Sequence, residues 1–153
     1  MQLARKLRRL RPVHAEAALF IVTARLLTAV LPFKIWQRFV GAPQEGPAPA
    51  QTPPPLTAPG TATASPAVMQ ARSLAARVER VAPIVPLKAT CLPRAIALLW
   101  MLRRRGYQSV RLHLGVASSP EAGFEAHAWL TVDGTIVIGE TDSMFQPLLA
   151  LEA

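Results

Sequence analysis

Apolar residues recur at intervals of three and four positions near the start of the chain, and this spacing predicts a helix over 13–31. The residues expected to share one apolar face are Leu19, Val22, Leu26, Ala29 and Val30. We expect this face to pack on the core or on a partner, with contact to a membrane surface as the alternative. The longest uncharged stretch, 17–24, is too short to span a bilayer, which needs about 20 residues.

Two more helices are predicted in the second half of the chain. Residues 68–81 place apolar side chains on one side, and Pro83 follows. The next helix begins after Thr90, an expected N-cap, and has Pro93 in its first turn. Residues 95–102 are apolar around the whole circumference, which indicates a buried helix, and Gly106 stands where a C-terminal cap belongs. This helix is expected at the centre of the domain.

Strand patterns follow the buried helix. Residues 110–116 alternate well enough for one strand, and two further apolar runs, 126–132 and 135–138, flank Asp133-Gly134. Asp-Gly between two apolar runs is the strongest short signal for a β-hairpin, so Asp133 is interpreted as a turn residue. Helices combined with antiparallel strands predict an α+β fold.

Residues 42–67 interrupt these patterns. Eight of the chain's 15 prolines fall in this segment, which predicts an extended linker without a core of its own. We therefore expect an N-terminal helical segment over 1–41, a proline-rich flexible linker over 42–67 and a catalytic domain over 68–153.

Composition narrows the function classes. The 153 residues suit a single domain, and neither a GxxxxGK[ST] nor a GxGxxG segment is present. A single cysteine excludes an internal disulfide and a CxxC zinc site, and it favours a reducing, cytoplasmic location. All 17 basic residues lie in the first 120 positions. Such a charge distribution would suit anionic lipid or nucleic acid, although basic residues that solvate helix faces explain it equally well.

Cys91 stands in the first turn of the predicted buried helix. Unpaired backbone N–H groups and the positive end of the helix dipole favour a thiolate there. The same N–H groups can donate to an oxyanion on a substrate carbonyl. The alternative is that Cys91 is a small buried apolar residue.

The predicted hairpin supplies a base and an acid for this thiol. With a two-residue loop, His127 lies opposite Glu140, with the β-carbons about 4.5–5.5 Å apart. A carboxylate there would hold one imidazole nitrogen and leave the other for the thiol. A register slip of one residue would favour Asp142 as the acid instead. Cys91, His127 and Glu140 therefore form the candidate constellation.

Other arrangements fit the sequence less well. His14 and His113 have no carboxylate placed beside them, and the chain contains no asparagine for a Cys-His-Asn site. A metal site would normally have paired, closely spaced ligands, which are missing here. We expect neither a metal nor an organic cofactor.

Two segments carry a family resemblance. CLPRAIALLWMLRRRGYQSVRLHLGV (91–116) and FEAHAWLTVDGTIVIGE (124–140) resemble the lasso peptide biosynthesis B protein family. LPFKIWQRFVG (31–41) is similar to the start of that family. These proteins are leader peptidases with a papain-related, transglutaminase-like cysteine protease fold, in which a helix bearing the cysteine packs on an antiparallel sheet bearing the histidine. The resemblance covers most of the chain outside the proline-rich segment.

The resemblance implies roles for the candidate residues. Cys91 would be the nucleophile, His127 its general base and Glu140 the orienting acid, where the family usually has aspartate. The implied reaction removes the leader from a lasso precursor peptide, before a separate cyclase forms the macrolactam. Because residues 1–41 are too few for the winged-helix recognition domain of some members, a separate leader-recognition protein is implied.

Two alternatives to this function stay open. One is an acyl or amide transferase that uses the same three residues. The other is a non-catalytic, basic helical protein that binds membranes or nucleic acid. A nucleic-acid partner is not expected if the protein is the peptidase.

Overall fold

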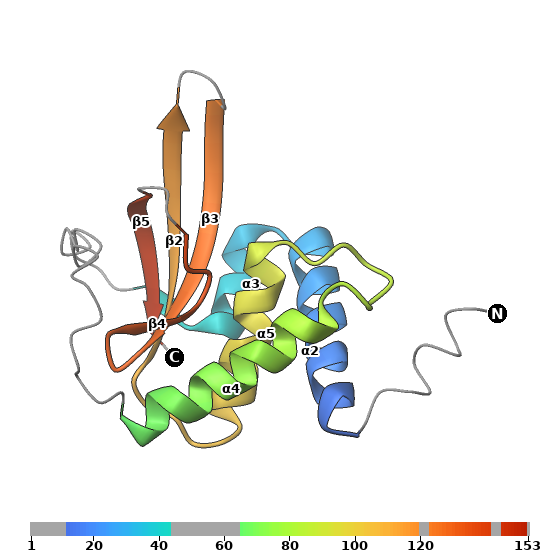
Figure 1. Cartoon of the computed structure of the whole chain (residues 1–153). Coiled ribbons are helices and arrows are strands. Elements are labelled where there is room, and N and C mark those ends of the chain that lie inside the picture. The colour runs from blue at the N-terminus through green and yellow to red at the C-terminus, as the bar shows by residue number, and fades with distance from the viewer. Residues whose placement is uncertain (1–11, 44–64, 120–122, 142–144, 153) are drawn as a thin grey trace.

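The computed structural model describes residues 12–43, 65–119, 123–141 and 145–152 (Figure 1). The helices are α2 (Pro12–Val30), α3 (Phe33–Val40), α4 (Pro66–Val81) and α5 (Cys91–Arg103). The strands are β1 (Ala42–Pro43), β2 (Val110–Ser119), β3 (Gly123–Val132), β4 (Thr135–Ile138) and β5 (Gln146–Glu152). They form one antiparallel sheet in the order β1-β5-β2-β3-β4, beside which the helices lie together (Figure 1). The expected α+β architecture is confirmed.

Helix α5 forms the centre of the core, as its uniformly apolar sequence predicts. It contacts α2, α3 and α4 as well as β2 and β3. Its buried residues are Pro93, Ala95, Ile96, Ala97, Leu98, Leu99, Met101 and Leu102. Thr90 occupies the N-cap position, but its side chain makes no capping hydrogen bond. Gly106 has a φ of 81° just beyond the helix, and its N–H donates to the carbonyl of Arg103.

The N-terminal helices belong to this same core. Ala17, Ile21 and Ala24 of α2 are fully buried, whereas Leu19 and Leu26 are 63% and 51% exposed. The face of large apolar residues expected from the sequence is therefore largely turned to solvent. Small alanines let α2 approach α5 closely, and they take the contact face for that reason. None of the described helices is long and apolar enough to cross a membrane.

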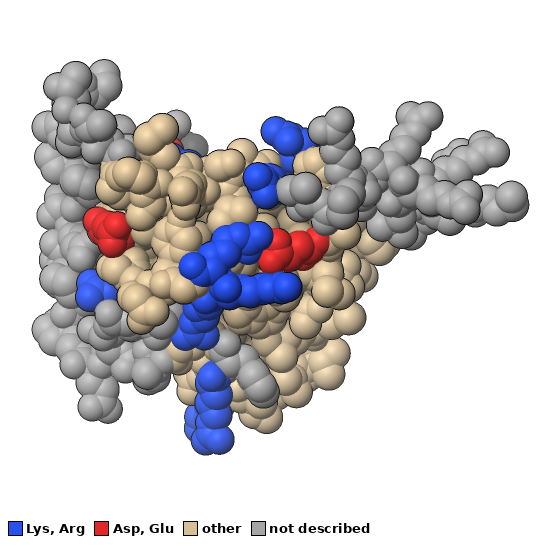
Figure 2. All heavy atoms as spheres, turned by 90° about the horizontal axis from the view of Figure 1, so that it is seen from below, with Lys and Arg blue, Asp and Glu red and all other residues tan. Residues whose placement is uncertain are grey.

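An ion pair fixes how α2 lies against the end of α5. The carboxylate of Glu16 accepts from both terminal nitrogens of Arg105, at 3.1 and 2.6 Å, and Arg104 lies 3.7 Å away. The hydrogen bond from Arg105 holds the pKa of Glu16 below its ordinary value. From below, Lys and Arg side chains gather in the middle of the face, next to an acidic side chain (Figure 2). Two of the basic side chains, Arg104 and Arg105, are therefore used to join the end of α5 to α2.

The predicted linker is shorter than expected at both ends. Ala42 and Pro43 form β1, which pairs with β5, and α4 already begins at Pro66. The Ser65 hydroxyl accepts from the N–H of Val68 and so caps α4. Residues 44–64 lie outside the described residues, so the linker itself stays a prediction.

The β3–β4 hairpin has the expected turn but not the expected register. Asp133 and Gly134 both have positive φ values, 49° and 76°, as a two-residue type I′ turn requires. Val132 pairs with Thr135 and Thr131 with Ile136, but Leu130 then pairs with Ile138. The register shift between Leu130 and Thr131 is a bulge, and the ladder ends at that pair. The expectation that Glu140 lies opposite His127 in the ladder is therefore wrong.

Candidate active site

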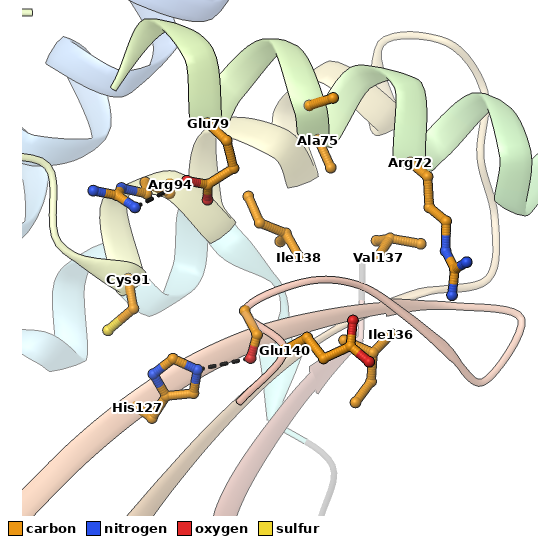
Figure 3. Close-up of a pocket in the computed structure, with 12 residues that line it drawn as sticks. Arg72, Ala75, Glu79, Cys91, Arg94, His127, Ile136, Val137, Ile138 and Glu140 are labelled. Carbon is orange, nitrogen blue, oxygen red and sulfur yellow. Dashed lines mark hydrogen bonds and ion pairs between the residues drawn. The ribbon is translucent and has the colours of Figure 1, made fainter. Parts of the chain in front are cut away.

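Cys91 and His127 line one pocket of about 600 Å³ between α4 and the β4 edge of the sheet (Figure 3). Helix α4 contributes Arg72, Ala75, Ala76 and Glu79. The first turn of α5 contributes Cys91 and Arg94, and the sheet side contributes His127 together with residues 136–140. The fold therefore brings the thiol and the imidazole, which lie 36 positions apart in the sequence, to the same cavity.

The partly buried thiol of Cys91 belongs to the first residue of α5. Backbone N–H groups in a first helical turn have no acceptor within the helix, and Pro93 has no N–H at all. The first backbone bond of this turn runs from the N–H of Arg94 to the carbonyl of Thr90, at 3.4 Å. The amides of Cys91 and Leu92 are therefore candidate donors to an oxyanion formed beside the sulfur.

The imidazole of His127 is held by a backbone carbonyl. Its Nε2 lies 2.8 Å from the carbonyl oxygen of Gly139. Because a carbonyl oxygen only accepts, Nε2 carries the proton, and Nδ1 keeps a lone pair. In Figure 3 the sulfur of Cys91 points toward the imidazole, on the side of the ring opposite the dashed hydrogen bond from Nε2. This arrangement suits transfer of the thiol proton to Nδ1.

Two aromatic side chains lie next to the imidazole of His127. The ring centroid of His127 lies 4.9 Å from that of Phe145 and 6.2 Å from that of Trp129. The indole of Trp129 lies so close to Gly115 that a Cβ there would come within 2.8 Å of it. A side chain at position 115 would therefore displace Trp129 and, through it, the histidine.

Glu140, the preferred acid, is not brought to the histidine. Glu140 is exposed, and Figure 3 shows its carboxylate directed away from His127 toward Ile136. The bulge in the hairpin and the end of β4 at Ile138 account for this difference. Asp142, the alternative acid, lies outside the described residues. The role of either residue as an orienting acid stays a prediction.

An ion pair at the pocket escaped the sequence interpretation. Arg94, one helical turn after Cys91, lies 2.9 Å from the carboxylate of Glu79 on α4. Its Nε also donates to the carbonyl of Ala89, at 2.9 Å. These contacts tie α4 to the segment that leads into Cys91. The sequence shows both charges but nothing that would pair them across 15 positions.

No metal centre is found among the residues that the structure describes, because no three His, Cys, Asp or Glu side chains are grouped there for ligation. His14 lies on α2, which packs on α5. His113, the third histidine, is buried on β2, where its Nε2 lies 3.0 Å from the Thr131 hydroxyl. Its ring stacks on that of Trp129, with the ring centroids 5.4 Å apart, and Trp129 in turn contacts His127.

His113 makes the stability of the fold depend on pH. Burial and, secondly, the charge of Arg111 lower the pKa of His113 from its ordinary value of 6.5. Below about pH 6.5 the unfolded chain therefore binds a proton that the folded chain does not. The contribution of His113 to stability is full above that pH and is lost as the pH falls.

We expect His113→Gln to flatten the decrease of the unfolding free energy between about pH 8 and pH 5. Urea denaturation of both proteins at several pH values measures this slope. The pKa of Glu16 is lowered from 4.5, so its contribution to stability is complete above that pH and is lost only at lower pH, outside this window. Equal slopes in the two proteins would show that folding does not lower the pKa of His113.

One comparison with known proteins identifies the family of the chain. A model of the transglutaminase-like superfamily matches residues 27–150, a range that includes Cys91 and His127. Neither the curated proteins nor the solved structures give a match. The matched range covers most of the chain, and the α+β fold is consistent with this superfamily. The chain belongs to the transglutaminase-like superfamily.

Proposed function

We propose that the protein is a cysteine peptidase that removes the leader from a lasso precursor peptide. Its superfamily contains cysteine peptidases and acyl transferases, which supports thiol chemistry at an acyl group. The observation that carries the proposal is the pair of Cys91 and His127 in one pocket, with Nε2 bonded to Gly139 and Nδ1 left for the thiol. The resemblance of 91–116 and 124–140 to lasso B proteins supplies the substrate class.

In the first step, Nδ1 of His127 takes the proton of the Cys91 thiol. The thiolate attacks the carbonyl carbon of the last leader residue, and the oxyanion accepts hydrogen bonds from the amides at the start of α5. When the C–N bond breaks, His127 gives its proton to the leaving nitrogen, which becomes the free amine of the core peptide. The leader then remains on the sulfur as a thioester.

In the second step, His127 removes a proton from water, and the hydroxide attacks the thioester carbonyl. The C–S bond breaks, the leader leaves with a carboxyl end, and the thiol recovers its proton. The freed amine of the core is the group that a macrolactam-forming cyclase needs as its nucleophile. The chain would therefore act before that cyclase.

Leader recognition is proposed to come from a separate winged-helix protein. The described elements before α4 are α2, α3 and β1, and the two helices contact the core around α5 or the sheet. They are packing elements of the catalytic fold rather than a recognition module. This proposal rests on the resemblance to lasso B proteins.

The test is cleavage of a candidate lasso precursor, followed by mass spectrometry, with and without the recognition protein. We expect two products, a leader with a carboxyl end and a core with a free amine, and much faster cleavage when the recognition protein is present. In heavy-oxygen water the leader carboxyl should gain the label. An intact precursor under both conditions would contradict the proposal. Leader joined to an added amine would instead identify an acyl transferase.

A further inference from the structure

The group that orients His127 is a peptide carbonyl. We propose that the backbone carbonyl of Gly139 positions the imidazole for proton transfer from Cys91. This inference rests on the proposed function, because the orientation of His127 matters to the rate only if His127 is the base. It goes further by assigning the third member of the site to the main chain.

The position of this carbonyl is fixed by close packing. Gly139 follows β4 directly and has a φ of 83°, in the left-handed region where side chains are strained. A Cβ there would lie 2.6 Å from the carbonyl oxygen of Ala128 and 2.8 Å from Cα of Trp129. The chain therefore runs against β3 right beside His127, which only a glycine allows. The carbonyl is held at 2.8 Å from Nε2 as a result.

The bulge in the hairpin explains how Gly139 replaces a side chain. Without it, residue 139 would continue the ladder with Ala128. With it, the ladder ends at Leu130–Ile138, and the carbonyl of Gly139 lies within 2.8 Å of the imidazole while the carboxylate of Glu140 points away (Figure 3). The hydrogen-bonding capacity of Nε2–H is thus used by the main chain.

A backbone carbonyl can orient the imidazole as a carboxylate does. It accepts the Nε2–H bond, and this selects the tautomer in which Nδ1 has the lone pair. It carries no full charge, so it stabilises the imidazolium less than a carboxylate would. A thiol tolerates this loss, since it gives up its proton more readily than a serine hydroxyl does.

The activity test compares two glycines with nearly equal φ angles, 83° at Gly139 and 81° at Gly106. Gly139→Ala should lower kcat by about 10-fold to 100-fold with little change in KM, because it displaces the base by a fraction of an ångström. Gly106→Ala is the matched control, since its φ is 81° and nothing lies within 4 Å of its missing Cβ. It adds the same backbone strain far from His127, and we expect an unchanged kcat. Equal losses in the two variants would overturn the proposal.

A second measurement holds even where Gly139→Ala does not fold. Nitrogen NMR of the wild-type protein should show His127 with its proton on Nε2, with the signal assigned by its loss in His127→Gln. Glu140→Gln should keep this tautomer, because the carboxylate of Glu140 points away from the ring and does not hold Nε2. A proton on Nδ1, or a tautomer that changes in Glu140→Gln, would overturn the proposal. Because this readout needs no substrate, it is independent of whether a precursor is cleaved.

Discussion

Cys91→Ala is expected to abolish precursor cleavage, and His127→Ala to lower kcat by a comparable factor, on the order of 10⁴ or more. The chain has one cysteine, so no second thiol can replace it. Cys91 and His127 are only partly buried at the pocket, so we expect both variants to fold. Single-turnover cleavage measured by mass spectrometry gives the rates, and circular dichroism shows whether each variant is folded.

The double variant Cys91→Ala/His127→Ala sharpens this test. Two residues that act as one unit give non-additive losses, so the double variant should be no slower than Cys91→Ala alone. Arg72→Gln is a control that changes the charge of the same pocket without touching the thiol or the imidazole, and it should leave kcat within about tenfold. Cleavage at the wild-type rate in folded Cys91→Ala would end the peptidase proposal.

The sequence predicted the parts of the fold that depend on near neighbours. The Asp133-Gly134 turn, the buried helix after Thr90 and the helix break at Gly106 are set by a few adjacent residues. Turn residues and caps act over one helical turn or one hairpin loop, so their signals are readable without tertiary contacts. Cys91 and His127 were located by these signals.

The orienting group depends on the register of a ladder several pairs long. One extra residue near Val137 changes every pairing beyond it, and Val137 is buried on β4, which contacts α4. The bulge is therefore set by packing between distant segments, which the sequence does not show. A main-chain carbonyl also has no residue type of its own. The one sequence feature at this position is a glycine, Gly139, directly after an apolar strand.

The side of α2 that faces the core is not the side with the large apolar residues, for a related reason. Periodicity identifies an apolar face, and it favours the larger residues Leu19 and Leu26. The residues of α2 that are buried instead are Ala17, Ile21 and Ala24, two of which are small and so favour close packing of helices. Glu16 lies on the side of α2 that faces α5, where it pairs with Arg105. Because the two residues are 89 positions apart, the sequence pattern does not show this pairing.

The last prediction compares a buried leucine of α5 with a half-exposed leucine of α2. Leu98 of α5 is fully buried and Leu26 of α2 is 51% exposed, although the sequence patterns treat both as core residues. Leu98→Ala should lower the unfolding free energy by about 2–5 kcal/mol, from lost burial together with the cavity that remains. Leu26→Ala should cost about 1 kcal/mol or less, since half of its surface is already in water and alanine suits a helix better.

Urea denaturation of the two variants and the wild-type protein measures both losses under the same conditions. For a domain stabilised by about 5–15 kcal/mol, the change at Leu98 is large enough to leave part of the population unfolded at growth temperature. Equal losses at the two positions would mean that Leu26 is covered in solution, and that the large apolar face of α2 packs as the sequence pattern predicts. A small loss at Leu98 would contradict the placement of α5 at the centre of the core.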